Sequence, residues 1–293
     1  MGIKISIKRR LLFLLGFVIY TKKMIRVSNK FLVYCRRLLH FFNLEIIHTS
    51  HKNEVLDLIR LLKPDSSYFN ALRVGPNGDG GYVVPDDLID IQYAFSPGCN
   101  NAWEFEHHLG EKWGIKSFML DVQEKKPLNL TPLQSYRNGW LDSVILENHL
   151  TLDEWICREG ISNTSELLLQ MDIEGSEYKC LMALDLKTLL RFKIMIIEFH
   201  NLNWLMNKPF FDNLVDPVFK RILNDFYIFN VHANNGGKEW RIKSFNFPDT
   251  LEITFHRKDR LNSKNLKNFN VDLNFPNVED KKDIKVQWDN FFK

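Results

Sequence analysis

Cysteine is scarce in this sequence, and no two cysteines lie close together along it. The four cysteines are at positions 35, 99, 157 and 180, so the chain contains no C-x-x-C pair. This spacing argues against a structural zinc site and against a disulfide framework, and it favours a reducing, cytoplasmic location. Glycine and proline are not enriched either, and 26% of the residues are charged. Most of the chain is therefore expected to be globular.

The signatures of two nucleotide-binding folds are also missing. No G-x-G-x-x-G follows a predicted strand, which argues against a nicotinamide-dependent oxidoreductase. No G-K-[ST] occurs, which argues against a P-loop enzyme.

Acidic residues are absent from the first 44 positions, which carry ten Lys or Arg, whereas the rest of the chain has 29 basic against 36 acidic residues. Because the basic residues lie outside the predicted sheet, binding of nucleic acid is not expected. The apolar run Leu11–Tyr20 has ten residues, whereas a membrane-spanning helix needs about 20. No small-x-small cleavage site follows it.

Residues 1–50 therefore form a basic amphipathic segment, for which two interpretations stay open. Its Phe, Tyr and Leu side chains among Lys and Arg are typical of a helix on an anionic membrane surface, which would make the protein peripheral on the inner face of the membrane. A helical extension that packs on the main domain or on a partner has the same composition.

Residues 51–258 have the pattern of an α/β domain. The spacing of Val55, Leu58, Ile59 and Leu62 predicts a helix that Pro64 ends. Further helices are predicted at 103–113 and 176–184. Strands alternating with helices predict a mostly parallel sheet with helices on both faces, and ligands bind beyond the carboxyl ends of such strands. The predicted strands are 71–74, 81–84, 93–96, 117–120, 167–171, 193–199, 227–231 and 251–255.

Two of these strand ends are suited to a nucleoside-containing cofactor. After strand 93–96, Gly98 opens a turn that leads into a helix, where the backbone can approach a ligand and free N–H groups face it. Strand 117–120 ends at Asp121, an acid placed to accept the hydroxyl protons of a ribose. A tight turn and a helix cap would explain either residue taken alone.

Carboxylates gather after the next two strands. Asp172 and Glu174 follow strand 167–171, and Glu198 and His200 close strand 193–199. Neighbouring strands would bring these side chains together, as a general base or as ligands of a hard divalent cation. The alternative is that Asp172 caps the following helix with acids in its first turn. Glu177 is assigned to that helix-start role.

The segment 231–237, VHANNGG, places three polar side chains at another strand end: His232, Asn234 and Asn235. A single histidine there is more often structural than catalytic, but its polar neighbours favour a function.

Several motifs in order resemble one family. The series RVGPNGDGGYVV, AFSPGCNNAWEFE, SFMLDV, LTLDEWI, LLLQMDIEGSEYKCLMAL, IMIIEFHNL, VHANNGG and PDTLEITFHRK is similar to the FkbM-like S-adenosylmethionine-dependent methyltransferases over about residues 70–258. The resemblance implies the Rossmann-like class I methyltransferase fold, a seven-stranded, mostly parallel sheet with an antiparallel last strand. Strands 227–231 and 251–255 would supply the closing hairpin.

The resemblance also implies roles for individual residues. The D-x-E, E-x-H and H-A-N-N motifs supply the candidate catalytic residues Asp172, Glu174, Glu198, His200 and His232. The loop at Gly98 departs from the several glycines that are common in methyltransferases. The candidate residues for binding S-adenosylmethionine are Gly98, Asn100, Asn101, Glu106 and Asp121, together with Asp79, Gly80, Gly81 and Tyr82 of the G-D-G-G-Y segment.

For a hydroxyl acceptor, Asp172, His200 or His232 would act as the base, or Mg²⁺ or Mn²⁺ held by Asp172, Glu198 and His200 would lower the pKa of the acceptor. The base is preferred, because no ligand set of fixed spacing is visible. FkbM-like proteins are associated with O-methylation of sugars, which implies a surface-polysaccharide, lipid-linked or nucleotide-sugar precursor. The candidates for stacking on a sugar are Trp103, Trp140, Trp204 and Trp240.

Two further alternatives are a non-catalytic membrane adaptor with a degenerate cofactor site and a metal-dependent methyltransferase with another small-molecule acceptor. Residues 259–293 form a tail rich in Asn and Lys, in which no chemistry is visible.

Overall fold

The structure, a computed structural model, forms two compact units, Met1–Ile47 and His48–Lys293. No helix among the described residues is long and apolar enough to cross a membrane. Most of the basic segment 1–44, Asn101 and residues 262–272 lie outside the described residues. Those described are 33, 38–39, 41, 48–65, 67, 69–100, 103–122, 129–242, 245–261 and 273–292.

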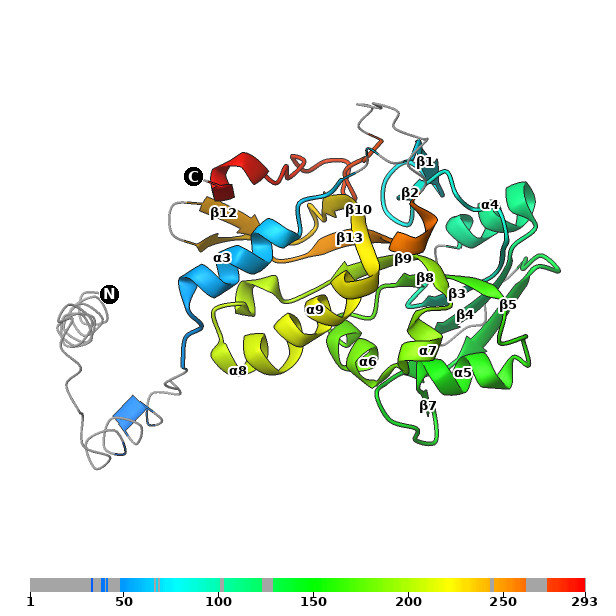
Figure 1. Cartoon of the computed structure of the whole chain (residues 1–293), viewed down its shortest axis with the longest axis horizontal. Coiled ribbons are helices and arrows are strands. Elements are labelled where there is room, and N and C mark those ends of the chain that lie inside the picture. The colour runs from blue at the N-terminus through cyan, green and yellow to red at the C-terminus, as the bar shows by residue number, and fades with distance from the viewer. Residues whose placement is uncertain are drawn as a thin grey trace. The chain divides into compact units, whose positions relative to one another are not determined.

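A seven-stranded sheet forms the centre of the second unit (Figure 1). Its order is β10-β13-β9-β8-β3-β4-β5, in which β13 runs antiparallel to both of its neighbours and the other pairs are parallel. The class I methyltransferase sheet expected from the sequence is thereby confirmed, with β10 and β13 as the closing hairpin. The strands are β3 (Ile91–Pro97), β4 (Lys116–Asp121), β5 (Gln134–Asn138), β8 (Glu166–Met171), β9 (Phe192–Phe199), β10 (Phe226–Ala233) and β13 (Leu251–Arg257).

Two predicted strands lie outside this sheet, and one strand of the sheet was not predicted. Residues 71–74 and 81–84 belong to a separate antiparallel hairpin, β1 (Ala71–Val74) and β2 (Tyr82–Pro85). The strand missed is β5, whose sequence QSYRN has no apolar run. It is an edge strand in which only Gln134 is buried. Its sequence therefore lacks the apolar pattern by which buried strands are predicted.

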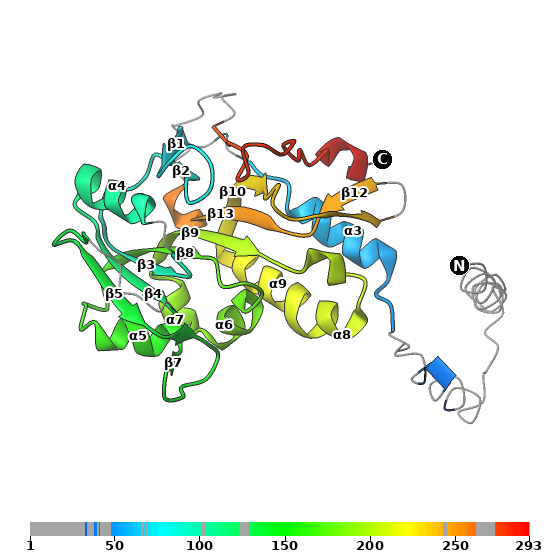
Figure 2. The ribbon, with the colours of Figure 1, turned by 180° about the vertical axis from the view of Figure 1, so that it is seen from behind.

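Apolar side chains cover both faces of the central strands. In β8, Leu167 and Leu169 join the core that includes α5, α6 and α9, whereas Leu168 joins the core with α4 and the β1–β2 hairpin. Figures 1 and 2 show these elements on opposite sides of the sheet. The helices are α3 (Lys52–Leu61), α4 (Glu104–Trp113), α5 (Leu152–Arg158), α6 (Glu177–Ala183), α7 (Leu186–Leu189), α8 (Lys208–Phe210) and α9 (Asp216–Asp225).

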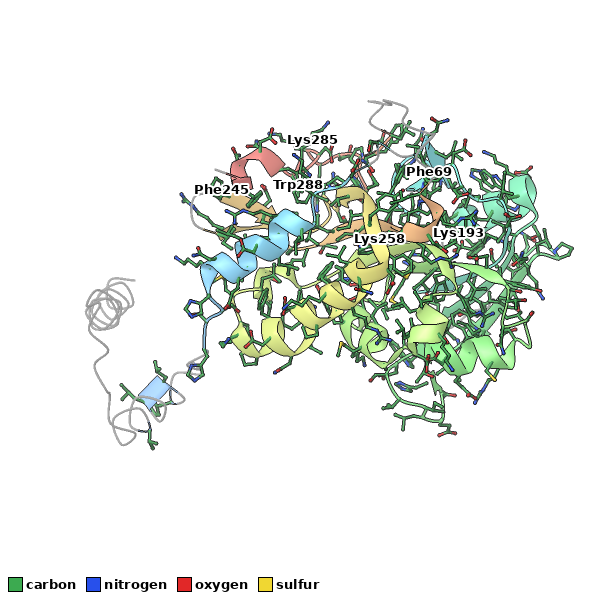
Figure 3. All side chains as sticks on the ribbon, in the orientation of Figure 1. Phe69, Lys193, Phe245, Lys258, Lys285 and Trp288 are labelled. Carbon is green, nitrogen blue, oxygen red and sulfur yellow. The ribbon has the colours of Figure 1, made fainter. Side chains whose placement is uncertain are left out.

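The described part of the tail, residues 273–292, packs against the end of the domain. Ile284 bridges to Ala233 of β10, and Phe291 packs against Phe247 with ring centroids 5.7 Å apart. Trp288, labelled in Figure 3, is partly buried against the main core. The remaining short strands are β6 (Trp140–Leu141), β7 (His149–Leu150), β11 (Glu239–Ile242) and β12 (Phe245–Pro248).

Candidate active site

The turn after β3 is joined to both neighbouring strand ends. Gly98 N donates to the Leu120 carbonyl at 2.9 Å, and Asp172 N donates to the Pro97 carbonyl at 3.1 Å. Gly98 has φ +80°, and a Cβ there would lie 1.5 Å from the Asp172 carbonyl oxygen. The glycine is therefore required by the close approach of the backbone at the end of β8, a reason that the sequence did not reveal.

Asp121, at the end of β4, organises the loop beyond this turn. Its Oδ2 accepts from Asn100 N at 2.5 Å, and its Oδ1 accepts from Val122 N at 2.6 Å. Each carboxylate oxygen has a second lone pair, so the group still has acceptor capacity for a sugar hydroxyl. Asn101, the other predicted loop residue, lies outside the described residues.

Glu106 of α4 is almost completely buried near the same turn. Burial raises the pKa of Glu106 to about 7. The hydroxyl of Ser96 lies beside the carboxyl group and opposes part of this shift, while Glu106 Oε2 has no hydrogen-bond partner among the described residues. Unsatisfied buried oxygens are costly, so a ligand with N–H or O–H donors would fit there.

The G-D-G-G-Y segment leads into β2 and contacts β8. The Nε2 of Gln170, on β8, donates to the Tyr82 hydroxyl at 3.1 Å, which ties the hairpin to the sheet. Asp79 Oδ1 accepts from Asn277 of the tail at 3.3 Å. Gly81 has no room for a side chain, since a Cβ would lie 1.9 Å from the Pro76 carbonyl oxygen, and Gly80 has φ +73°.

The structure brings the D-x-E and E-x-H residues together around one nitrogen. His200 Nε2 lies 3.7 Å from Asp172 Oδ1, 3.5 Å from Glu174 Oε2 and 3.6 Å from Glu198 Oε1. The potential ligand atoms of Asp172, Glu174 and His200 all lie within 4.8 Å of one another. We call Asp172, Glu174, Glu198 and His200 the rim cluster. Neighbouring parallel strands place it at the carboxyl ends of β8 and β9.

Burial and mutual repulsion shift the titration of the rim cluster. Burial raises the pKa of Asp172 to about 7. Burial also raises the pKa of Glu198, and the charge of Asp172 raises it further. For His200, burial lowers the pKa, but the hydrogen bond to Glu177 and the surrounding carboxylates outweigh burial and raise it to about 9.

Glu177 does more than the helix-start role assigned to it from the sequence. It does accept N–H groups at the start of α6, from Ile173 at 3.2 Å and Gly175 at 3.0 Å. Yet its side chain is fully buried, and its Oε1 lies 3.0 Å from His200 Nδ1. Glu177 therefore orients the imidazole so that Nε2 faces the rim cluster. The alternative role of Asp172, as the cap of this helix, is not observed, because Ser176 is the residue that precedes α6.

His232 lies in a second group beside the rim cluster. Its Nδ1 is 3.0 Å from Glu252 Oε2, and in the register of the sheet Glu252 stands between His232 and Glu198. Asn234 Nδ2 donates to Glu198 Oε1 at 2.7 Å. Glu252 was missed in the sequence because it lies within the apolar run LEITF. An acid inside an otherwise apolar strand was the available signal.

The model of the protein family described as "Methyltransferase FkbM domain" matches residues 67–224, more than half of the chain. The chain belongs to the FkbM methyltransferase family. The family match spans the G-D-G-G-Y segment, the Gly98 turn, Asp121 and the whole rim cluster, and it ends before His232. A comparison with curated protein sequences gave no match.

Solved structures that resemble this FkbM protein include a putative ribosomal RNA methyltransferase from Plasmodium falciparum, with TM-score 0.34, 10% identity, 58% of this chain and 88% of that chain covered. Precorrin-6y C5,15-methyltransferase from Geobacter metallireducens has TM-score 0.32 and 9% identity, and the match covers 71% of this chain and 88% of that chain. A putative RNA methyltransferase from Pyrococcus horikoshii has TM-score 0.29 and 11% identity, and the match covers 70% of this chain and 98% of that chain.

The four tryptophans of this FkbM protein that were candidates for stacking differ in exposure. Trp140, which follows β5, and Trp204, which follows β9, have 54% and 51% of their surface exposed. Trp103 is partly buried, and Trp240 packs against the main core. Trp140 and Trp204 are therefore the more accessible of the four.

Proposed function

We propose that this FkbM methyltransferase uses S-adenosylmethionine to methylate a sugar hydroxyl on a surface-polysaccharide, lipid-linked or nucleotide-sugar precursor. The observation that carries the proposal is the direct contact between the Gly98 turn and the Asp172 backbone. Because of this contact, a cofactor at the turn would lie beside the carboxylates and histidine of the rim cluster.

The residues at the turn fit such a cofactor. Asp121 would accept the ribose hydroxyls, and the buried Glu106, with its unsatisfied Oε2, would accept N–H or O–H donors of the ligand. The G-D-G-G-Y segment would cover the pocket from the side of the hairpin. When bound, S-adenosylmethionine supplies a methyl carbon on a positively charged sulfur, which makes that carbon electrophilic.

Asp172 is the best placed base for the acceptor. A hydroxyl oxygen that gains a methyl group becomes positive, so its proton must leave for a nearby acceptor atom. The pKa of Asp172, about 7, is matched to that transfer near neutral pH. The raised pKa of His200 keeps its imidazole protonated at pH 7, so His200 would not act as the base while it carries that proton. It would then stabilise the ionised form of Asp172.

The sugar acceptor is supported by two exposed aromatic side chains. Trp140 and Trp204 follow strands at the same edge of the sheet as the rim cluster and are half exposed. An indole face binds the apolar face of a sugar ring, while the ring hydroxyls stay available to polar groups.

The test combines binding with methyl transfer. Calorimetry should detect S-adenosylmethionine binding, and labelled cofactor should transfer its methyl group to extracted surface glycans or nucleotide sugars. Asp172→Asn should lose at least about 10²-fold in rate while still binding cofactor. The control Asp212→Asn, at an exposed site on η2 (Phe211–Val215), should behave like the wild type. Absence of cofactor binding in the wild type would instead favour the non-catalytic, membrane-associated adaptor.

A metal-dependent variant of this reaction is the second candidate, and it rests on the surroundings of His200 Nε2. Three carboxylate oxygens lie 3.5 to 3.7 Å from that atom, and Asp172 Oδ1 has no hydrogen-bond partner among the described residues. Glu177 holds Nδ1, as carboxylates commonly do behind a histidine ligand. Asp172, Glu174 and His200 would hold Mg²⁺ or Mn²⁺, with Glu198 beside them, and the ion would lower the pKa of the acceptor.

Chelation distinguishes the two mechanisms. Full activity in excess EDTA, together with loss of activity in His200→Ala, would support the base mechanism. Loss of activity in EDTA that Mg²⁺ or Mn²⁺ restores would support the metal-dependent one.

A further inference from the structure

The side chain of Asn277, in the described part of the tail, connects two acids from distant parts of the chain. Its Nδ2 lies 2.6 Å from Glu252 Oε1 and 3.3 Å from Asp79 Oδ1. An amide nitrogen carries two hydrogens, so it can donate to both carboxylates at once. Asn277 lies 198 residues from Asp79 and outside the family match, which ends at residue 224.

Both acids belong to the surroundings of the rim cluster. Glu252 is buried, and its other oxygen, Oε2, contacts His232, so Asn277 completes the partners of this carboxylate. Asp79 belongs to the G-D-G-G-Y segment, and its charge is among those that raise the pKa of Asp172. A neutral donor between two carboxylates attracts both, whereas a negative group in its place would repel both.

The backbone next to Asn277 is fixed by a separate set of contacts. Asn235 lies just after β10, and its Nδ2 donates to the carbonyls of Val278 at 2.9 Å and Lys281 at 3.1 Å. Its Oδ1 accepts from Val278 N at 2.8 Å. Asn235 is itself buried. The position of the Asn277 amide is therefore set by the main chain. The amide adds a contact to Asp79 beside the bonds that Arg73 donates to the carbonyls of Pro76 and Gly78 in the same segment.

We propose that Asn277 is a positioning residue that holds the G-D-G-G-Y segment against β13, and so keeps the wall of the cofactor pocket in place. This inference rests on the proposed function, because that segment is assigned to the pocket there. Under this inference the tail, which lies beyond the family match, contributes a residue to the cofactor site. Loss of the amide removes this contact and leaves the segment held by Arg73. The wall is then less firmly placed, and the pocket binds S-adenosylmethionine more weakly without a change in the reacting groups.

The test replaces the amide by a carboxylate of the same shape. Asn277→Asp should raise the Kd for S-adenosylmethionine by roughly tenfold. It should raise the KM for the cofactor similarly, while kcat at saturating cofactor stays within about twofold. Amide hydrogen exchange at residues 75–82 should become faster. Asn277→Ser, which keeps one donor, should give a smaller effect and remains informative if the aspartate variant does not fold.

The matched control is Asn274→Asp, in the same segment. Asn274 pairs with the Asn230 amide on β10, at 3.0 and 3.2 Å. The control should bind the cofactor like the wild type. The inference is overturned if Asn277→Asp binds within twofold of the wild type, or if Asn274→Asp weakens binding equally. Failure of the wild type to bind S-adenosylmethionine is a different result, which overturns the proposed function and this inference with it.

Discussion

At the scale of single residues, the buried acids of this protein are of two kinds. Asp87, outside the rim cluster, has cationic partners: burial alone raises its pKa, but hydrogen bonds from His256 and Lys193 outweigh burial and hold it at about 2. Glu106 and Asp172, near the Gly98 turn, have raised pKa values because burial dominates. Acids whose burial outweighs the effect of their partners cost stability, and Glu106 and Asp172 lie where the cofactor and acceptor are proposed to bind.

Glu106→Gln should stabilise the protein at pH 8. The pKa of Glu106 is about 7 in the fold against 4.5 ordinarily, so the folded state binds more protons between these values and the free energy of unfolding falls as pH rises through them. Glutamine removes that penalty, which is on the order of 3 kcal/mol at pH 8 and vanishes near pH 4. Urea unfolding at both pH values measures it.

The neighbouring Glu104 provides the control for this prediction. It lies on the same helix, α4, but is exposed. Glu104→Gln should change the free energy of unfolding by less than about 0.5 kcal/mol at either pH. A Glu106→Gln variant that is less stable than the wild type at pH 8 would contradict the burial argument.

Lys193 offers a second prediction for a single side chain. It is fully buried at the start of β9, where its Nζ lies 2.9 Å from Asp87 Oδ1 (Figure 3). Lys193→Met should destabilise the fold by roughly 2–4 kcal/mol, because Asp87 loses a buried partner. Lys220→Met, at a pair in which the lysine is 71% exposed, should destabilise the fold much less, because water screens the pair. Equal losses in thermal unfolding would count against this difference.

At the scale of elements, the site depends on how closely the ends of β3 and β8 approach. The Gly98 turn fits against the Asp172 carbonyl only without a side chain. The same contact fixes where the Asp172 side chain leaves the strand. The helix that follows, α6, contributes Glu177 behind His200. Packing of strand ends therefore sets the geometry of the rim cluster.

Gly98→Ala should damage both the fold and the site. A Cβ would lie 1.5 Å from the Asp172 carbonyl oxygen, so β3 and β8 must separate. We expect a loss of more than about 3 kcal/mol and loss of cofactor binding. Gly114→Ala is the control: its φ is similar at +68°, but no atom lies within 4 Å of the added Cβ. It should cost about 1 kcal/mol. Urea unfolding and calorimetry distinguish the two outcomes.

At the scale of the whole molecule, the site draws on parts of the chain that are far apart in sequence. Asp79 precedes the sheet, the rim cluster lies in the middle, and Glu252 and Asn277 follow near the end. The family match covers Asp79 and the rim cluster, and it ends before Glu252 and Asn277. We expect the family domain to carry the chemistry, and the later segments to adapt its pocket.

The basic segment gives the prediction for the full chain. With ten Lys or Arg and no acid in residues 1–44, the chain should float with anionic vesicles at low salt and dissociate at high salt. A chain that lacks residues 1–44 should not float, and neutral vesicles should bind neither form. Equal flotation of both chains would contradict the membrane interpretation and leave the segment as a contact for the domain or a partner.

The sequence by itself determined six of the seven strands of the central sheet, the sheet class and the grouping of Asp172 and Glu174 with Glu198 and His200. Buried parallel strands are apolar runs that end in polar residues, so periodicity and strand ends carried that information. Tertiary structure decided what local patterns do not record. It placed Glu252 between Glu198 and His232, Glu177 behind His200, and Asn277 between Glu252 and Asp79. These contacts depend on sheet register and on the approach of segments that are distant in sequence.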